Sequence, residues 1–350
     1  MAVRHTFLKI LLLVMTGAIF SPHAEAISFN LDSIAEWGKF PRFCVNTYRW
    51  GDKFFNTYDS AYVVGTGTKF NVKLTTDSWM DTYHFMLPNS QKMEMWSDPS
   101  TSVGAYITYL AVSVGYDINI SNLFGGVKDA RSRYRFGFDC SLLGVEAYIE
   151  NNDVGTKIKR FGPYDNISMP FDGAHIHSWG IDAYYFFNHK RYSQAAAFSF
   201  SKVQKRSQGS FYAGLAIFSQ DYDFDFSTLN PRFLALLPAE WKDYHYRVKT
   251  HNYGLRLGYG YNWVFARNWA LCVSVSPTVG FKTGYVNSDE KRTSFSLYSR
   301  AKLSIVWNKG KWFVGAVGKI DSSIVSDRRT TFLGANLSAS AAVGYRFNLW

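Results

Sequence analysis

Apolar and polar residues alternate with a period of two along most of the chain after residue 66. Successive side chains of a β-strand point to opposite faces, so this alternation predicts strands with one apolar face and one polar or small face. We expect residues 336–350 to form such a strand, with Arg346 facing the interior of the protein. The residues of this strand that we expect to face lipid are Leu337, Val343, Tyr345 and Phe347.

Twelve segments have this alternation or a comparable apolar run. The predicted strands are residues 66–77, 79–87, 103–117, 133–150, 176–188, 194–206, 210–222, 246–264, 269–285, 292–307, 312–325 and 336–350. Most exceed the roughly 9–11 residues that a tilted membrane strand needs. We therefore predict an all-β fold, an antiparallel transmembrane β-barrel of about 12 strands, closed by pairing of the C-terminal strand with residues 66–77. A terminal strand of a soluble β-sandwich is the alternative for residues 336–350.

Two long connections, residues 151–174 and 223–243, interrupt the predicted strands. Long loops of such barrels lie outside the cell. Counting strands back from the C-terminus places the second loop outside and the first on the periplasmic side. This conflict means that the strand count between them is off by one or that one loop is internal. Residues 133–150 are predicted as one strand with a bulge near Gly144, and residues 194–206 as one arm of a hairpin with residues 210–222.

The N-terminus has the pattern of a cleaved secretory signal over residues 1–26. A basic start precedes the apolar run of residues 10–20 and an A-x-A site at residues 24–26. An N-terminal anchor is the alternative, and no other run reaches the roughly 18 apolar residues of a membrane helix. Residues 27–65 are expected to form a periplasmic segment of short helices or an inward-folded plug, and residues 66–350 an outer-membrane barrel.

Composition agrees with a barrel. Aromatic residues make up 18% of the chain, with 23 Tyr, 29 Phe and 11 Trp, which is expected if aromatic girdles mark two membrane interfaces. The net charge of +11 favours anionic partners, namely lipid headgroups or small anionic solutes, whereas nucleic acid is excluded for an exported chain. The three cysteines, Cys44, Cys140 and Cys272, form no C-x-x-C motif and allow at most one disulfide.

Several motifs resemble a Bacteroidetes outer-membrane family known as domain of unknown function 4421. They are residues 62–67 (YVVGTG), 123–126 (LFGG), 184–197 (YYFFNHKRYSQAAA), 207–211 (SQGSF) and 258–263 (GYGYNW). The resemblance covers nearly all of the chain after the predicted signal. It implies a signal-bearing outer-membrane β-barrel and brings no catalytic residues.

The predicted inward faces are rich in cations. The basic residues expected to line the lumen are Lys69, Lys73, Arg133, Arg135, Arg256, Lys282, Arg300, Lys302 and Arg346. Only Asp139 and Asp182 oppose them in the predicted strands. The pattern indicates an anion-attracting lumen. The alternative is a packed interior in which the cations meet carboxylates of the N-terminal segment, such as Asp32, Glu36, Asp52 and Asp59.

The sequence gives little indication of a metal-binding, catalytic or phosphate-binding site. His175 and His177 share one strand face and could bind a metal, but no third ligand is evident. Ser178 lies beside His177, yet adjacent strand residues point to opposite faces, which argues against a Ser–His catalytic pair. Gly258 and Gly260 are more simply explained as small inward residues of a strand than as a phosphate-binding loop.

We therefore expect a non-enzymatic protein of the outer membrane that acts as a structural barrel or as a narrow passive channel with a basic lumen. No cofactor or metal is indicated. The expected partners are outer-membrane lipids, the barrel-assembly machinery acting through the C-terminal strand, and small anionic solutes. A lipid-acting membrane enzyme and a soluble periplasmic binding protein are the alternatives.

Overall fold

The structure is a computed structural model. It describes residues 36, 38–55, 57–87, 91–109, 112–120, 132–152, 155–239, 241, 244–286, 292–326 and 330–348. The chain divides into two compact units, residues 1–52 with 348–350 and residues 53–347. The predicted signal of residues 1–26 lies outside the described residues. The first helix with described bounds is α3 (Lys39–Phe55).

The second unit consists mainly of antiparallel strands. Their bounds are β1 (Val63–Gly65), β2 (Phe70–Met86), β3 (Lys92–Ser97), β4 (Ser100–Tyr109), β5 (Val112–Asn119), β6 (Ser132–Asp139), β7 (Leu143–Asn152), β8 (Thr156–Phe161), β9 (Met169–Phe171), β10 (Ala174–Phe186), β11 (Lys202–Gln204), β12 (Gln208–Asp225), β13 (His245–Ala266), β14 (Trp269–Val286), β15 (Arg292–Lys309), β16 (Trp312–Ser326) and β17 (Thr331–Phe347). Two short helices, α5 (Gln194–Ala197) and α6 (Pro231–Leu234), interrupt them. Among the described residues, no helix has the length and hydropathy needed to cross a membrane.

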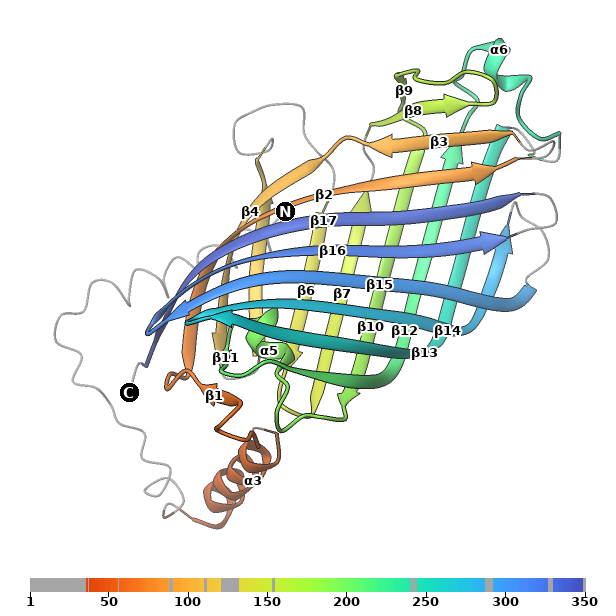
Figure 1. The fold of residues 1–350 in the computed structure, drawn as a ribbon. Coiled ribbons are helices and arrows are strands. Elements are labelled where there is room, and N and C mark those ends of the chain that lie inside the picture. The colour runs from red at the N-terminus through yellow and green to blue at the C-terminus, as the bar shows by residue number, and fades with distance from the viewer. Residues whose placement is uncertain are drawn as a thin grey trace. The chain divides into compact units, whose positions relative to one another are not determined.

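Within the described part of the chain, twelve strands pair side by side around a ring. Their order is β2, β4, β5, β6, β7, β10, β12, β13, β14, β15, β16 and β17, and β17 pairs again with β2. The pairing of β17 with β2 runs from Thr331 opposite Met86 to Phe347 opposite Phe70. The shortest strand pairing in the ring is between β5 and β6, which have two paired residues each. Figure 1 shows these strands curling around an interior, with β8, β9 and α6 at one end and α5 and β11 at the other. The predicted all-β antiparallel barrel is confirmed.

The alternation of the sequence separates the two faces of the strands. The outward residues of β13 are exposed and apolar or aromatic from Tyr253 to Phe265, whereas Arg247 and Lys249 lie earlier on the same face. On β14 the exposed apolar residues run from Trp269 to Phe281. Twelve residues at about 3.3 Å per residue, tilted by about 40°, span roughly 30 Å, the thickness of a bilayer's hydrocarbon core. The outer surface therefore has an apolar band of membrane thickness with aromatic residues at its borders.

Four predicted strand boundaries are wrong, although the total of twelve is right. Residues 103–117 contain both β4 and β5, and residues 133–150 contain both β6 and β7. The change of alternation before Gly144 comes from a tight turn, in which the Cys140 N–H donates to the Leu143 carbonyl at 2.9 Å, rather than from a bulge. Residues 66–77 and 79–87 belong to the single strand β2, and residues 194–206 form α5 and β11 instead of a wall strand. The first two errors predict two strands too few and the last two predict two strands too many, so the predicted total is still twelve.

The two long connections lie at the same end of the ring. Residues 153–173 link β7 to β10 and residues 226–244 link β12 to β13. Because residues 194–206 are not a wall strand, two strands rather than three separate these connections, which resolves the conflict in the sequence count. Figure 1 shows β8 and β9 from the first connection beside α6 from the second.

The pairing of β17 with β2 can be tested by cross-linking. Thr76 and Ala341 are partners in the register and both are exposed. Partner residues of antiparallel strands have Cα atoms about 4.5–5.5 Å apart, within disulfide range. In a Cys44→Ser background, the double variant Thr76→Cys and Ala341→Cys is expected to form a disulfide, seen as a mobility shift on non-reducing gels.

The matched control combines Thr76→Cys with Leu337→Cys. Leu337 pairs with Met80, four residues along β2, so about 13 Å of strand separates these two positions and no disulfide should form. Equal cross-linking of both variants, or none in the first, would contradict the register.

Candidate functional site

One end of the ring is filled by the connection between β10 and β12. We call residues 187–207 the inner segment; it includes α5 and β11, and β11 pairs with β1. Ser193 caps α5, because its hydroxyl oxygen accepts from the Ala196 N–H at 3.2 Å, as serine does at helix N-termini. Ala195, Ala196 and Ala197 are buried, so this segment packs as an apolar insert rather than as an exposed loop.

Inward polar side chains anchor the inner segment to the wall. The Asn262 amide of β13 donates to the Ser193 carbonyl at 2.9 Å and to Gln204 Oε1 at 3.0 Å. Gly260 leaves room for Tyr192, since a Cβ there would lie 2.3 Å from the tyrosine oxygen. Burial raises the pKa of Tyr192 well above its usual value, so its hydroxyl stays protonated and donates to Gln194 Oε1 at 2.9 Å. The small inward residues of β13 thus accommodate this segment.

Arg346 of β17 fastens the same segment from another side. It is 1% exposed, and its guanidinium donates to the Phe200 carbonyl and to Asn308 Oδ1. It also lies over the Phe313 ring, 4.5 Å from the centroid. Arg346 lies on the inward face of β17, where its partners are carbonyl oxygens and an aromatic ring.

The opposite end of the ring is filled by aromatic residues. The aromatic cluster consists of Tyr83, Phe85, Phe161, Phe171, Tyr222, Phe224, Phe226, Trp241, Tyr246 and Phe332. The ring of Phe85 lies 5.3 Å from that of Phe224 and 5.2 Å from that of Tyr246. Since β2 and β12 are six places apart in a ring of twelve, these contacts cross the whole lumen.

A cavity of about 280 Å³ lies between the inner segment and the aromatic cluster. The inner segment contributes Phe198, Ser199 and Phe200 to its lining, and the aromatic cluster contributes Tyr83 and Tyr222. All strands of the ring except β13 and β14 supply the remaining lining, much of it charged.

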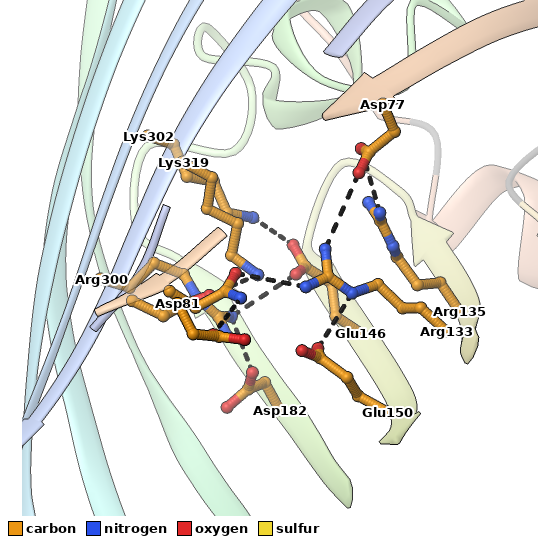
Figure 2. Close-up of polar contacts among 12 residues, drawn as sticks. Asp77, Asp81, Arg133, Arg135, Glu146, Glu150, Asp182, Arg300, Lys302 and Lys319 are labelled. Carbon is orange, nitrogen blue, oxygen red and sulfur yellow. Dashed lines mark hydrogen bonds and ion pairs between the residues drawn. The ribbon is translucent and has the colours of Figure 1, made fainter. Parts of the chain in front are cut away.

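Arg300 is the centre of the larger ion-pair network, which Figure 2 shows. It is 4% exposed and pairs with Asp182 at 2.7 Å and with Asp321, its direct neighbour across β15 and β16. Asp182 also pairs with the buried Arg256 at 3.1 Å. Glu146 of β7 lies 3.5 Å from Arg300 and also pairs with Lys302. These two contacts connect β7 with β15, five places apart in the ring.

Asp77 and Arg133 form a second network. Arg133 pairs with Glu150 at 2.9 Å and lies 3.8 Å from Asp77, which also pairs with Arg135 at 3.0 Å (Figure 2). The Arg133 guanidinium stacks over the Trp79 ring, 4.1 Å from its centroid. Buried charges are costly unless paired, so these contacts are what allows the cations to occupy the interior.

The structure places eight of the nine predicted basic residues on inward faces of the strands. Five of them form ion pairs with carboxylates, namely Arg133, Arg135, Arg256, Arg300 and Lys302. Lys73 lies over the Tyr106 ring at 4.9 Å, and Lys282 donates to the Ile324 carbonyl at 3.4 Å. Lys69 precedes β2 and is not part of the cavity lining.

Most of the carboxylate partners cannot be identified from the sequence. They are strand residues, chiefly Asp77, Glu146, Glu150, Asp182 and Asp321, and of these only Asp182 was expected to face inward. Glu146 and Glu150 belong to β7, which the sequence pattern merges with β6 into one predicted strand over residues 133–150.

The expected N-terminal carboxylates do not supply the partners that the structure describes. Asp59 pairs instead with Arg191 at 3.6 Å, and Glu36 is exposed. Asp32 and the side chain of Asp52 lie outside the described residues.

Carboxylates outnumber cations around the cavity. The acidic lining residues are Asp77, Asp81, Asp117, Asp139, Glu146, Glu150 and Asp321, seven in all, and the basic ones are Lys73, Arg133, Arg135, Lys302 and Lys319, five in all. The described lining therefore carries two more negative than positive formal charges. This balance does not favour the expected attraction of anionic solutes, which stays a prediction.

The histidine and serine residues considered for catalysis or metal binding do not point to a common site. His175 and His177 are exposed on the outward face of β10, whereas Ser178 faces the cavity. Among the described residues, no three His, Cys, Asp or Glu side chains are grouped closely enough to hold a metal ion. Cys140 and Cys272 are buried free thiols and Cys44 is an exposed one.

Comparisons with known proteins identify a family. The sequence profile of the family described as "Domain of unknown function (DUF4421)" matches residues 57–347. The search of curated proteins finds no match.

Similar solved structures are distant. They include the outer membrane protease OmpT from Escherichia coli, at 6% identity and a TM-score of 0.39, covering 79% of this chain and 96% of that one. An outer membrane channel from Pseudomonas putida F1 has 7% identity and a TM-score of 0.34, covering 82% and 99%. The translocator domain of the autotransporter NalP from Neisseria meningitidis has 10% identity and a TM-score of 0.28, covering 91% and 98%. These similarities are too remote to support any argument about function.

The ion-pair network predicts a large cost for removing Asp182. The Asp182→Asn variant leaves the buried Arg256 without a charged partner among the described residues, and breaking a buried pair costs about 3–5 kcal/mol of unfolding free energy. A lower urea midpoint of the detergent-solubilised protein, followed by tryptophan fluorescence, measures this. The matched control is Glu94→Gln, whose pair with Arg160 is partly exposed at 3.4 Å, so its midpoint should stay near that of wild type. Equal midpoints for Asp182→Asn and wild type would contradict the structural role of the network.

Proposed function

This chain belongs to the family described as "Domain of unknown function (DUF4421)", and we propose that it is an outer-membrane β-barrel whose lumen is blocked along its axis. Its role in this proposal is structural and non-enzymatic. The observation that carries the proposal is a set of contacts that cross the lumen at three levels. These are the aromatic cluster, the ion pairs of Arg300 with Asp182 and of Arg133 with Asp77, and the inner segment held by Arg346.

The membrane location is supported by the outer surface. An exposed apolar band with aromatic borders is costly in water and suits the hydrocarbon core and interfaces of a bilayer. On the outward face of β13 the charged residues end at Lys249, and the exposed apolar and aromatic residues begin at Tyr253. A soluble periplasmic protein would not need such a band.

The alternatives from the sequence have less support. A passive channel needs a continuous water path, and packed rings from opposite strands interrupt it. A lipid-acting enzyme needs a nucleophile and base within hydrogen-bond reach, whereas Ser178 and His177 point to opposite faces of β10.

The proposed partners are membrane lipids and the barrel-assembly machinery. Val343 and Tyr345 are exposed on the outward face of β17, in phase with Phe347, which is the pattern that a C-terminal recognition strand would present.

Planar-bilayer recordings test the blocked lumen. The refolded wild-type protein is expected to insert without stable ohmic conductance, and its heat-modifiable gel mobility confirms folding. The comparison variant replaces residues 190–206 with a four-residue Gly-Ser linker and carries Phe85→Ala and Phe332→Ala. It should conduct because both blocked ends are loosened. Steady conductance of the folded wild type would refute the proposal, whether or not the variant folds.

A further inference from the structure

The helix α3 combines aromatic and basic residues on its surface. Its 17 residues, KFPRFCVNTYRWGDKFF, contain four basic residues and one acidic residue. A helix advances 100° per residue, so residues three, four, seven and ten positions apart share a face. On this spacing Phe40, Phe43, Cys44 and Trp50 lie on one side of α3.

This aromatic side is open in its own unit. Phe40 is 75% exposed, Phe43 66% and Trp50 63%, and Cys44 is exposed among them. Three large aromatic side chains on one face of a single helix are an unusual surface for contact with water.

The basic residues lie on the side of the helix next to Trp50, beside the aromatic side. Arg42, Arg49 and Lys53 recur at intervals of seven and four, and Lys39 stands three residues before Arg42. Asn46 lies between them on the same side and is exposed. The helix thus pairs an aromatic face with a cationic face and has a formal charge of +3.

We propose that α3 lies in the interface of the membrane, with its aromatic face among the upper acyl chains and its cations among anionic phospholipid headgroups. Helices with this distribution of Phe, Trp, Lys and Arg bind in the plane of a membrane, and anionic lipids strengthen the binding. The charge of the helix selects this partner, because an apolar protein groove would not require a cationic flank. The proposal rests on the membrane location proposed for the barrel.

Cys44 provides a native reporter on the aromatic face. It is the exposed cysteine, whereas Cys140 and Cys272 are buried, so a nitroxide spin label can be attached to the full-length protein at this position. The labelled protein is reconstituted into vesicles of phosphatidylcholine alone or with one quarter phosphatidylglycerol. Accessibility to oxygen and to a water-soluble nickel chelate then gives the immersion of the label. Flotation and heat-modifiable mobility report separately whether the barrel is inserted and folded.

The matched control carries Cys44→Ser and Asn46→Cys, which moves the label to the cationic face. We expect the Cys44 label to be shielded from nickel and accessible to oxygen in vesicles with phosphatidylglycerol, and the control label to remain accessible to nickel. A variant with Lys39→Gln, Arg42→Gln, Arg49→Gln and Lys53→Gln should lose this shielding, with insertion of the barrel unchanged.

Three results would overturn the proposal. Nickel access at Cys44 in both vesicle types would show that α3 stays in water. Equal shielding with and without phosphatidylglycerol would remove the role of anionic headgroups. Shielding of both labels, with no oxygen preference, would show protein packing such as a second copy. If the protein fails to float with vesicles, the barrel's membrane location fails first, and this inference with it.

Discussion

The pairing of buried charges across the lumen is the interaction on which the rest of the structure depends. A ring of twelve strands that presents an apolar surface outward must place its polar residues inside. Arg300, Arg256 and Arg133 are nearly or fully buried there, and an unpaired guanidinium in such a place is strongly destabilising. Asp182 and Glu146 on strands across the ring, and Glu150 on the strand next to Arg133, offset that cost. The contacts of Arg300 connect walls that are far apart in the ring and so reduce the space inside.

The two ends of the lumen are closed by different means that suit their surroundings. The end with the long connections extends past the apolar band, and its aromatic cluster forms an ordinary hydrophobic core there. The other end is closed by the inner segment, whose backbone carbonyls would be unsatisfied without donors from the wall. Asn262 and Arg346 provide those donors. The cavity is the volume that remains between these two packed regions.

The period of two was enough to predict the fold class and the face of most residues, because lipid outside and polar groups inside impose it on every wall strand. The period of two gives the wrong structure where a segment alternates like a strand but does not pair in the wall. Residues 194–206 alternate like a strand yet fold inward, because the wall offers Asn262 and Gly260 to receive them. The sequence indicates a bulge rather than a turn at Cys140, because residues 140–143 contain no glycine or proline. Most of the carboxylate partners could not be predicted, since pairing between Glu146 and Lys302 depends on which strands face each other across the ring.

The central claim is that packed residues block the lumen at both ends, and thiol accessibility tests it most directly. Ser338 faces the cavity and Ser227 is exposed in the connection after β12. In a Cys44→Ser background reconstituted into vesicles, a charged, membrane-impermeant maleimide should modify Ser227→Cys faster than Ser338→Cys by about 100-fold or more, since reaction inside requires local opening. Similar rates at the two positions, with both proteins folded, would contradict a blocked lumen.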